Sequence, residues 1–312
     1  MRTRMIVLMA LVLAGVLAVP VRAQGGLSEK ELALLDRVYV ARDNLHNSSS
    51  YVEVSVGEQA QTLTVEAGGR TQSSASVRSW DRTATVLREG GALWNVQAFL
   101  TMTFENSGPV NTSTFSVNGE ARLVGGVLYV NGAFEDASTV PAGITLPEGW
   151  VALENDGRWP VLERLGLDAY LDESSPFDDI EVIKAAATSI TSEPDTLEDG
   201  TPVDLITIAF DSPGVVAVYR SMKDLEPTTL HILDRLGGDT QATLVLALDA
   251  SDTVHFVYNE VIFDASGLDP AQVGVGDPNA TVRFEMNQSQ TQTYSDFDAP
   301  VAPVAAPDTL AE

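Results

Sequence analysis

Cysteine is absent from all 312 residues of the chain. Its absence excludes disulfides, thiolate metal sites and cysteine nucleophiles, and it removes the residue that a bacterial lipoprotein needs for lipid attachment. The fold must therefore be stabilised by its own hydrophobic core, and a chain of this length can bury one.

Basic residues are scarce, with 18 Lys and Arg against 44 Asp and Glu. Only three lysines occur, Lys30, Lys184 and Lys223, so no basic patch is expected. A surface this acidic repels nucleic acid and anionic lipid headgroups. We take the charge as favouring a soluble protein outside the cytoplasm and as excluding a nucleic-acid partner.

Long hydrophobic runs are limited to the N-terminus. Arg2 and Arg4 precede an apolar run from residue 5 to 19, and residues 21–23 fit the small-x-small pattern before a cleavage site. The run is shorter than the roughly 20 residues of a membrane-spanning helix. The sequence predicts a signal peptide over residues 1–23 and a mature chain without a transmembrane segment, located in the periplasm, cell envelope or extracellular space. A retained anchor is the alternative.

Catalytic signatures are missing as well. The sequence contains no GxSxG or HExxH element, no phosphate-binding glycine loop and no dinucleotide fingerprint. His46, His231 and His255 are expected on three separate elements, so we predict no metal site and no cofactor. The acidic residues near 168–181 match solvated helix ends. A carboxylate pair for glycoside hydrolysis stays open, because acids are so numerous.

Periodicity indicates one α+β domain over residues 24–300. A capping-box pattern at Ser28 opens a helix, and residues 51–136 alternate with period two between Gly-Gly turns, which predicts five or six antiparallel strands. Helices are expected at 159–171, from 175, after 212 and at 227–236. A polar loop is expected at 192–200, and strands at 203–210, 244–248, 254–263 and 282–286. The expected architecture is a large antiparallel sheet with helices against one face. The Pro/Ala-rich residues 301–312 are predicted to be a disordered tail.

Three stretches carry a resemblance to a known family. They are GEARLVGGVLYVNG at 119–132 with LPEGWVALE at 146–154, the hairpin at 243–263, and TYSDFDAPV at 293–301. In this order they resemble the LolA/LppX-like fold of bacterial lipoprotein carriers, most of all its LppX–LprG branch. The resemblance spans roughly residues 28–304.

The resemblance implies a half-barrel sheet whose concave face is covered by helices, with an apolar cavity between them. Members bind acyl chains of lipids or lipoproteins there without chemistry. The expected function is thus a non-enzymatic extracytoplasmic carrier or chaperone, with an envelope protein as a further partner. The alternatives are a periplasmic sensor or adaptor using the same fold, and a secreted hydrolase using an acid pair.

Aromatic and aliphatic residues on the predicted elements are the candidates for the cavity wall, and an ordinary packed core is the competing interpretation. Those expected on the concave face of the sheet are Trp94, Phe99, Phe115, Val117, Tyr129, Phe256, Tyr258, Phe284 and Met286. Those expected on the helices above it are Trp159, Leu162, Leu165, Phe177, Ile180 and Ile183.

Overall fold

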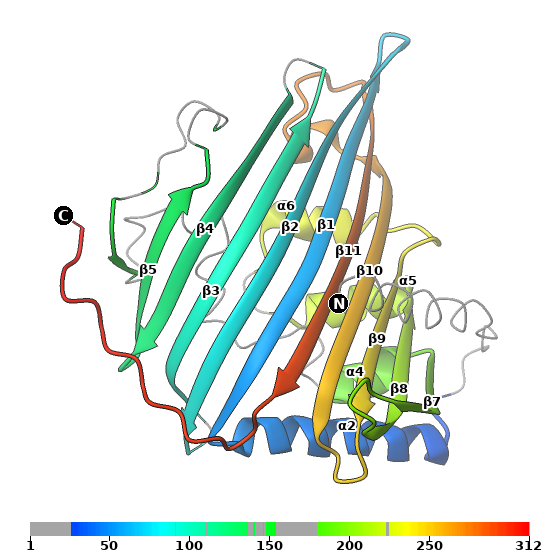
Figure 1. The fold of residues 1–312 in the computed structure, drawn as a ribbon. Helices are drawn as coiled ribbons and strands as arrows, with labels where there is room; N and C mark the ends of the chain where they lie inside the picture. The colour runs from blue at the N-terminus through cyan, green and yellow to red at the C-terminus, as the bar shows by residue number, and fades with distance from the viewer. Residues whose placement is uncertain are drawn as a thin grey trace.

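One antiparallel sheet of 11 strands organises the chain (Figure 1). The computed structural model describes residues 26–311 except 91, 110–111, 137–139, 141–145, 147, 154–179 and 223–224. The strand order is β6-β5-β4-β3-β2-β1-β11-β10-β9-β8-β7. Their bounds are β1 Ser50–Ala67, β2 Arg70–Glu89, β3 Ala92–Ser107, β4 Thr112–Val124, β5 Val127–Phe134, β6 Val151–Leu153, β7 Ser189–Thr196, β8 Pro202–Asp211, β9 Gln241–Leu248, β10 Val254–Leu268 and β11 Thr281–Ser295.

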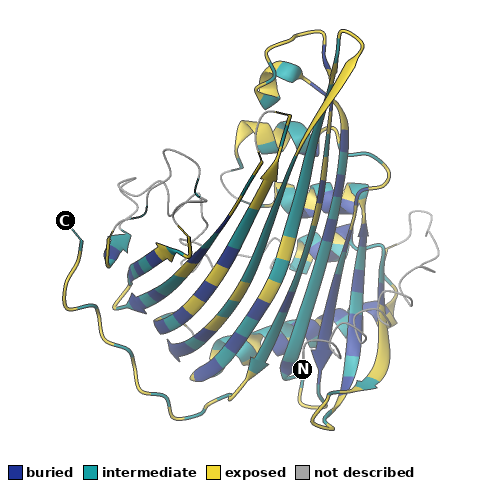
Figure 2. Cartoon of the chain, turned by 45° about the horizontal axis from the view of Figure 1, so that its top comes forward, coloured by how far each residue is buried: buried dark blue, intermediate teal, exposed yellow. Residues whose placement is uncertain are grey.

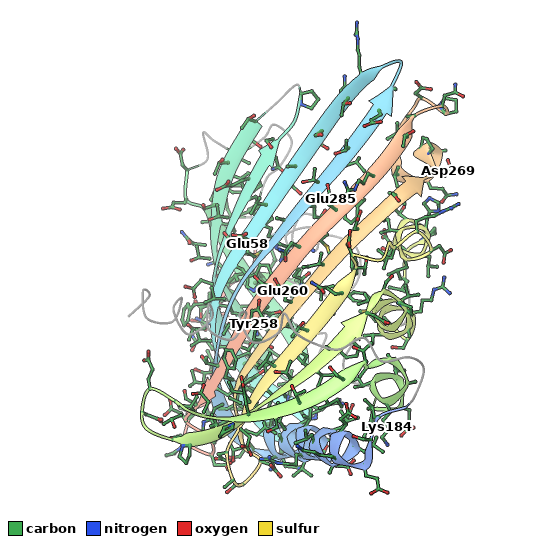
Figure 3. All side chains as sticks on the ribbon, turned by 90° about the vertical axis from the view of Figure 1, so that its right-hand side faces the viewer. Glu58, Lys184, Tyr258, Glu260, Asp269 and Glu285 are labelled. Atoms are coloured by element: carbon green, nitrogen blue, oxygen red, sulfur yellow. The ribbon has the colours of Figure 1, made fainter. Side chains whose placement is uncertain are left out.

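Four α-helices are seen in the described part of the chain. They are α2 Glu29–Asn47, α4 Ile180–Ala186, α5 Ser212–Arg220 and α6 Pro227–Leu233, and a 3₁₀ turn, η2, covers Pro270–Val273. Figure 3 shows α4, α5 and α6 stacked on one side of the sheet, with α2 across its lower end. No helix among the described residues is long and apolar enough to cross a membrane.

Local sequence explains how the helices begin. The side chain of Ser28 caps α2, and Glu31 reaches back to the Ser28 amide, so both halves of the capping box form. α5 is capped by Asp211, whose Oδ1 accepts from the Gly214 amide at 3.0 Å. The sequence placed this helix start at Ser212-Pro213, one residue later than the residue that supplies the cap.

The two halves of the chain meet where β1 pairs with β11, from Val52 opposite Ser295 to Glu66 opposite Thr281. Residues paired directly across antiparallel strands point to the same face of the sheet. One cross-strand row can therefore be followed from β4 to β9. Its members are Phe115, Phe104, Arg78, Gln59, Gln288, Val261 and Ala242.

This row defines the helix-packed face. At its β8–β11 end, Val261 and Ala242 belong to the largest core cluster, which also contains Leu35 of α2 and Ile183 of α4. Leu35 is fully buried, and burying such a side chain contributes about 1.5–3 kcal/mol. The helices are therefore held mainly by the β8–β11 half of the sheet.

The prediction of a large antiparallel sheet is confirmed, and the strands described within residues 51–136 are β1 to β5. One strand was missed, because residues 192–200 were expected to be a loop while β7 runs through Thr196. β7 is a polar edge strand with Pro194 in it, and such strands lack the alternation that marks a half-buried strand. The helix predicted at 159–171 and the start of the one at 175 lie outside the described residues.

The tight turn between β9 and β10 gives a pH-dependent prediction. Asp249 Oδ1 accepts from the amides of Ser251 at 2.8 Å and Thr253 at 3.0 Å, and Oδ2 lies 3.1 Å from His255 Nε2. Desolvation alone would raise the pKa of Asp249, but these hydrogen bonds together hold it below the ordinary value.

A carboxyl with a lowered folded-state pKa adds stability above its unfolded pKa, about 3.9, and loses it as the pH falls through the folded value. Asp249→Asn should therefore be less stable than wild type at pH 7, and the difference should shrink below about pH 4. Urea unfolding across pH 3–7 measures this, with the exposed Asp43→Asn as the control. A difference that stays constant with pH would contradict the assignment.

Candidate ligand-binding groove

A groove of about 680 Å³ opens at the upper end of the molecule. Its floor comes from the helix-packed face of β1, β2, β3 and β11, and its other wall from α6 and η2. The described residues that line it are Gln61, Leu63, Ser74, Ala75, Ser76, Asn106, Ser107, Gly108, Pro109, Thr228, Ile232, Gln272, Val273, Gly274 and Phe284.

None of these described lining residues is charged, although the chain as a whole is strongly acidic. Leu63, Ile232 and Phe284 give the groove apolar surface, while side chains such as Gln61 and Asn106 offer neutral donors and acceptors. Apolar walls with a few neutral polar groups suit an uncharged or weakly polar part of a ligand.

The α6–η2 wall is fastened by side chain to backbone bonds. His231 Nε2 accepts from the Asp269 amide at 2.9 Å, and Thr228 Oγ1 donates to the Gln272 carbonyl at 3.4 Å. Asp269 Oδ1 in turn accepts from the Ala271 amide and caps η2. Figure 3 shows Asp269 at this upper end, beyond the helices. The bonds place Gln272 and Val273 opposite the sheet.

Below the groove, a strip of glutamine and serine side chains follows β1 and β11 down the helix-packed face. Gln59 Nε2 donates to Gln288 Oε1 at 3.2 Å and also lies 3.2 Å from Met286 Sδ. One step further down, Gln290 Nε2 donates to Ser55 Oγ at 2.9 Å. We call these residues, with Gln292, the glutamine strip.

The lower end of the glutamine strip contains an ion pair. Gln292 Nε2 donates to Glu53 Oε1 at 3.2 Å, and the same carboxylate pairs with Arg82. Glu53 and Ser55 are buried, whereas the four glutamines of the strip remain partly exposed. Polar side chains of this kind need water or a hydrogen-bond partner, and the partly exposed amides of the strip keep access to one or the other.

Gly57 interrupts the strip and allows an aromatic ring to lie over β1. A Cβ at Gly57 would fall 2.2 Å from Cζ2 of Trp80 and 2.9 Å from the Ser289 carbonyl oxygen. The guanidinium of Arg78 lies 5.7 Å from the Trp80 ring and 5.9 Å from the Phe104 ring. Glycine is therefore required here for close approach rather than for backbone conformation.

The strip divides the helix-packed face into two apolar halves. The β8–β11 half packs against the helices as described above. The β3–β6 half forms a second cluster that includes Leu100, Met102, Leu128 and Val130, with Trp80 and Phe104 at its margin. Apolar surface therefore flanks the strip on both sides.

Four of the candidate residues from the sequence lie on the helix-packed face. Phe115 and Val117 belong to the β3–β6 cluster, Met286 to the helix cluster, and Phe284 lines the groove. Of the helix candidates, Ile180 and Ile183 of α4 pack in the helix cluster. Trp159, Leu162, Leu165 and Phe177 lie outside the described residues.

Other candidates lie on the opposite face, which corrects their expected position. Phe99 lies between buried Ala98 and Leu100 and is 54% exposed, so it points away from the helices. Tyr129 alternates in the same way with Leu128 and Val130. Sequence alternation separates the two faces of a strand but does not say which face the helices cover.

Phe256 and Tyr258 also face away from the helices. They pack with Val203, Leu205 and Val245 in a separate small cluster. Burial there raises the pKa of Tyr258 to about 12, and the charge of Glu260 adds to the shift. Tyr258 and Glu260 are labelled on the sheet in Figure 3.

Trp94 lies at an irregular point of β3. It has no partner across the ladder, because the register between β2 and β3 shifts at this point, and its side chain is 43% exposed. It does not line the groove.

Most groove residues were missed by sequence reasoning, which searched for aromatic and aliphatic side chains. The available signal is the spacing of glutamines at 59 and 61 in β1 and at 288, 290 and 292 in β11. Side chains two apart on a strand share a face, so both strands predict an amide-lined face. That spacing does not predict that β1 and β11 pair with each other.

Metal ligands do not gather in the described part of the chain, where no group of three or more His, Asp and Glu side chains could hold an ion. The histidines lie on α2, α6 and β10. His231 and His255 have separate partners, Asp269 and Asp249.

Comparison with solved structures finds several proteins that this chain resembles in part. The chain is similar to LppX. This lipoprotein of Mycobacterium tuberculosis matches with 12% identity and a TM-score of 0.36, over 89% of this chain and 100% of that one. LprF from Mycobacterium bovis gives 12% identity and a TM-score of 0.35, covering 90% and 99%. A DUF1329 family protein from Desulfovibrio piger gives 9% identity and a TM-score of 0.24, covering 88% and 96%.

LppX belongs to the branch that the sequence resemblance named. No family model and no curated protein matches the sequence. At TM-scores this low the likeness by itself assigns no ligand and no partner.

Proposed function

We propose that the chain is a non-catalytic extracytoplasmic carrier or chaperone that binds a lipid or lipoprotein acyl chain between its sheet and its helices. The observation that carries the proposal is the uncharged groove on the helix-packed face of an otherwise strongly acidic chain. Its volume of about 680 Å³ lies within the range of small-molecule sites, roughly 300–1,000 Å³. The concave side of the curved sheet would then be the helix-packed side.

Apolar burial would supply the affinity. Each methylene removed from water contributes about 0.8 kcal/mol, so about ten methylenes match the roughly 8 kcal/mol of a micromolar dissociation constant. The cost of association must be offset as well. Acyl chains of ordinary length meet this requirement, and Leu63, Ile232 and Phe284 offer the first apolar contacts at the groove.

The glutamine strip favours a ligand that also carries neutral polar groups. Amide side chains both donate and accept, so ester or hydroxyl groups next to an acyl chain would be paired at Gln59 or Gln61. A purely hydrocarbon ligand would leave those amides to water or to one another. We therefore expect an amphiphile rather than a plain hydrocarbon.

A sensor or adaptor function is the second candidate, and one observation favours it. Phe99 and Val56 are 54% and 40% exposed on the face that points away from the helices. A partner protein that covered these two side chains would remove their apolar surface from water. A hydrolase with an acid pair gains no such support, because no carboxylate is among the described groove residues.

Native mass spectrometry of the full chain purified from its own cells tests the carrier proposal. We expect one equivalent of an acyl-bearing compound, released by organic solvent and regained on incubation with a lipid extract. Protein that is folded, ligand-free and unable to take up any lipid would contradict the proposal and favour the adaptor.

A further inference from the structure

The C-terminal segment, residues 299–311, forms neither helix nor strand, yet it follows a defined path. It crosses the lower ends of β1 to β4 and rises beside β5 (Figure 1). Ser50 Oγ donates to the Ala299 carbonyl at 2.7 Å, and the Ala311 amide donates to the Trp150 carbonyl at 2.6 Å. The sequence predicted a disordered tail here, and the structure holds the segment at both ends.

Burial from residue 301 to 307 repeats every third residue. Val301, Val304 and Pro307 are half-buried, and the residues between them are exposed. Figure 2 shows partly buried positions alternating with exposed ones along the segment. A period of three is that of a polyproline II helix, which needs no internal hydrogen bonds and suits a Pro/Ala-rich sequence.

The surface beneath recognises the main chain of the segment. Asn95 Nδ2 donates to the Val304 carbonyl and Asn95 Oδ1 accepts from the Val304 amide, both at 2.9 Å. Arg122 donates to the Ala305 carbonyl at 3.3 Å, and its guanidinium lies 4.5 Å from the Trp150 ring centre. An amide that pairs with both backbone groups of one residue holds the main chain of that residue in an extended conformation.

The recognising side chains are positioned by the sheet rather than by the segment. Asn95 is 5% exposed on β3, and Arg122 on β4 is also paired with Glu120 at 2.8 Å. The Asn95 and Arg122 side chains and the Trp150 ring form one surface, which we call the tail track. Side chains fixed on a sheet can bind extended proline-containing segments at low entropic cost.

The segment enters the tail track through a turn that can act as a hinge. Asp296 and Asp298 have φ of 53° and 56°, a left-handed conformation that non-glycine residues adopt uncommonly. Asp298 Oδ1 accepts from the Ser49 amide at 2.7 Å and from Ser49 Oγ at 2.9 Å. Beyond this turn no ladder of backbone bonds joins the segment to the sheet.

We propose that the tail track is a binding site for an extended, proline-containing segment of another protein, occupied in this structure by the chain's own C-terminus. The partner segment has an aliphatic residue or proline at every third position, as Val301, Val304 and Pro307 do. The tail competes as a tethered ligand at an effective concentration of the order of millimolar, so the partner binds best when the tail is released. The proposal does not depend on a ligand in the groove.

The test uses a labelled peptide of residues 299–312 and the full chain. A variant carrying Val304→Asp and Pro307→Asp releases its own tail, and its fold is checked by thermal unfolding. We expect saturable peptide binding to this variant, and binding at least tenfold weaker to wild type, whose tail occupies the track. Adding Asn95→Ala should weaken the binding at least tenfold, whereas Asn118→Ala, an amide elsewhere on β4, should not.

A second variant protects the test against misfolding. Asn95→Asp keeps the size and the acceptor for the Val304 amide but loses the donor to the Val304 carbonyl, and should also weaken binding. A folded, tail-released variant that binds no peptide would overturn the proposal. Peptide binding that is unaffected by both Asn95 substitutions would overturn it equally.

Discussion

Replacing Phe284 by tryptophan is expected to weaken acyl-chain binding at least tenfold while changing the free energy of unfolding by less than about 1 kcal/mol. Phe284 lines the groove and is only partly buried, so a larger ring extends into open space. In a filled core the same change would cost about 1–3 kcal/mol of stability. Titration with a fluorescent fatty-acyl probe and urea unfolding measure the two effects.

The matched control is Phe99→Trp, because Phe99 lies on the opposite face and is 54% exposed. It makes the same chemical change away from the groove and should alter neither probe binding nor stability. Equal losses of binding in the two variants would show that the groove is not the binding site. A large stability loss in Phe284→Trp alone would show that the space is filled.

Gly57→Ala is expected to destabilise the protein by about 2–3 kcal/mol, the upper part of the range for overpacked positions. The added methyl group would lie 2.2 Å from the Trp80 ring, so the indole must leave its place over β1. The backbone oxygen of Ser289 on the neighbouring strand blocks the other side at 2.9 Å. Chemical denaturation gives the change in the free energy of unfolding.

Gly132→Ala provides the comparison, since a Cβ there meets its nearest atoms at an ordinary 3.7 Å. This strand glycine should tolerate alanine at little cost. Adding Trp80→Leu to Gly57→Ala should recover part of the lost stability, and a double-mutant cycle measures the coupling. Stability of Gly57→Ala within 0.5 kcal/mol of wild type, a rough limit for unstrained surface changes, would contradict this packing.

Much of the fold could be predicted because its local signals are strong. The capping box at Ser28 and the alternation through Phe115 and Val117 each correspond to an element at the expected place. β7 could not be predicted in this way. It is an exposed edge strand that forms by pairing with β8, as where Ile190 lies opposite Ile208. Its own sequence lacks the alternation of apolar and polar residues that predicts a strand.

The candidate site was predicted less well, for two physical reasons. Alternation gives two faces for each strand, but only packing against α2 and α4 decides that Met286 faces the helices and Tyr258 does not. The search also took apolar residues as the sign of a binding site. The groove and the strip below it contain neutral amides such as Gln59 and Gln61, which become a shared surface only when β1 pairs with β11.

The C-terminal segment is a third feature that the sequence predicts only in part. Composition disfavours helix and strand for residues 301–311, because Pro303 and Pro307 lack amide donors. Composition says nothing about a partner for the remaining backbone groups. That partner, Asn95, lies about two hundred residues earlier in the chain and meets Val304 only in the folded sheet.

Titration of the wild-type chain with the fluorescent fatty-acyl probe is the most direct test of the central claim, that the groove on the helix-packed face binds an acyl chain. We predict saturable binding of one probe per chain, which a neutral acyl ester displaces and the free headgroup alone does not. Absence of saturable binding to folded, delipidated protein would contradict the claim.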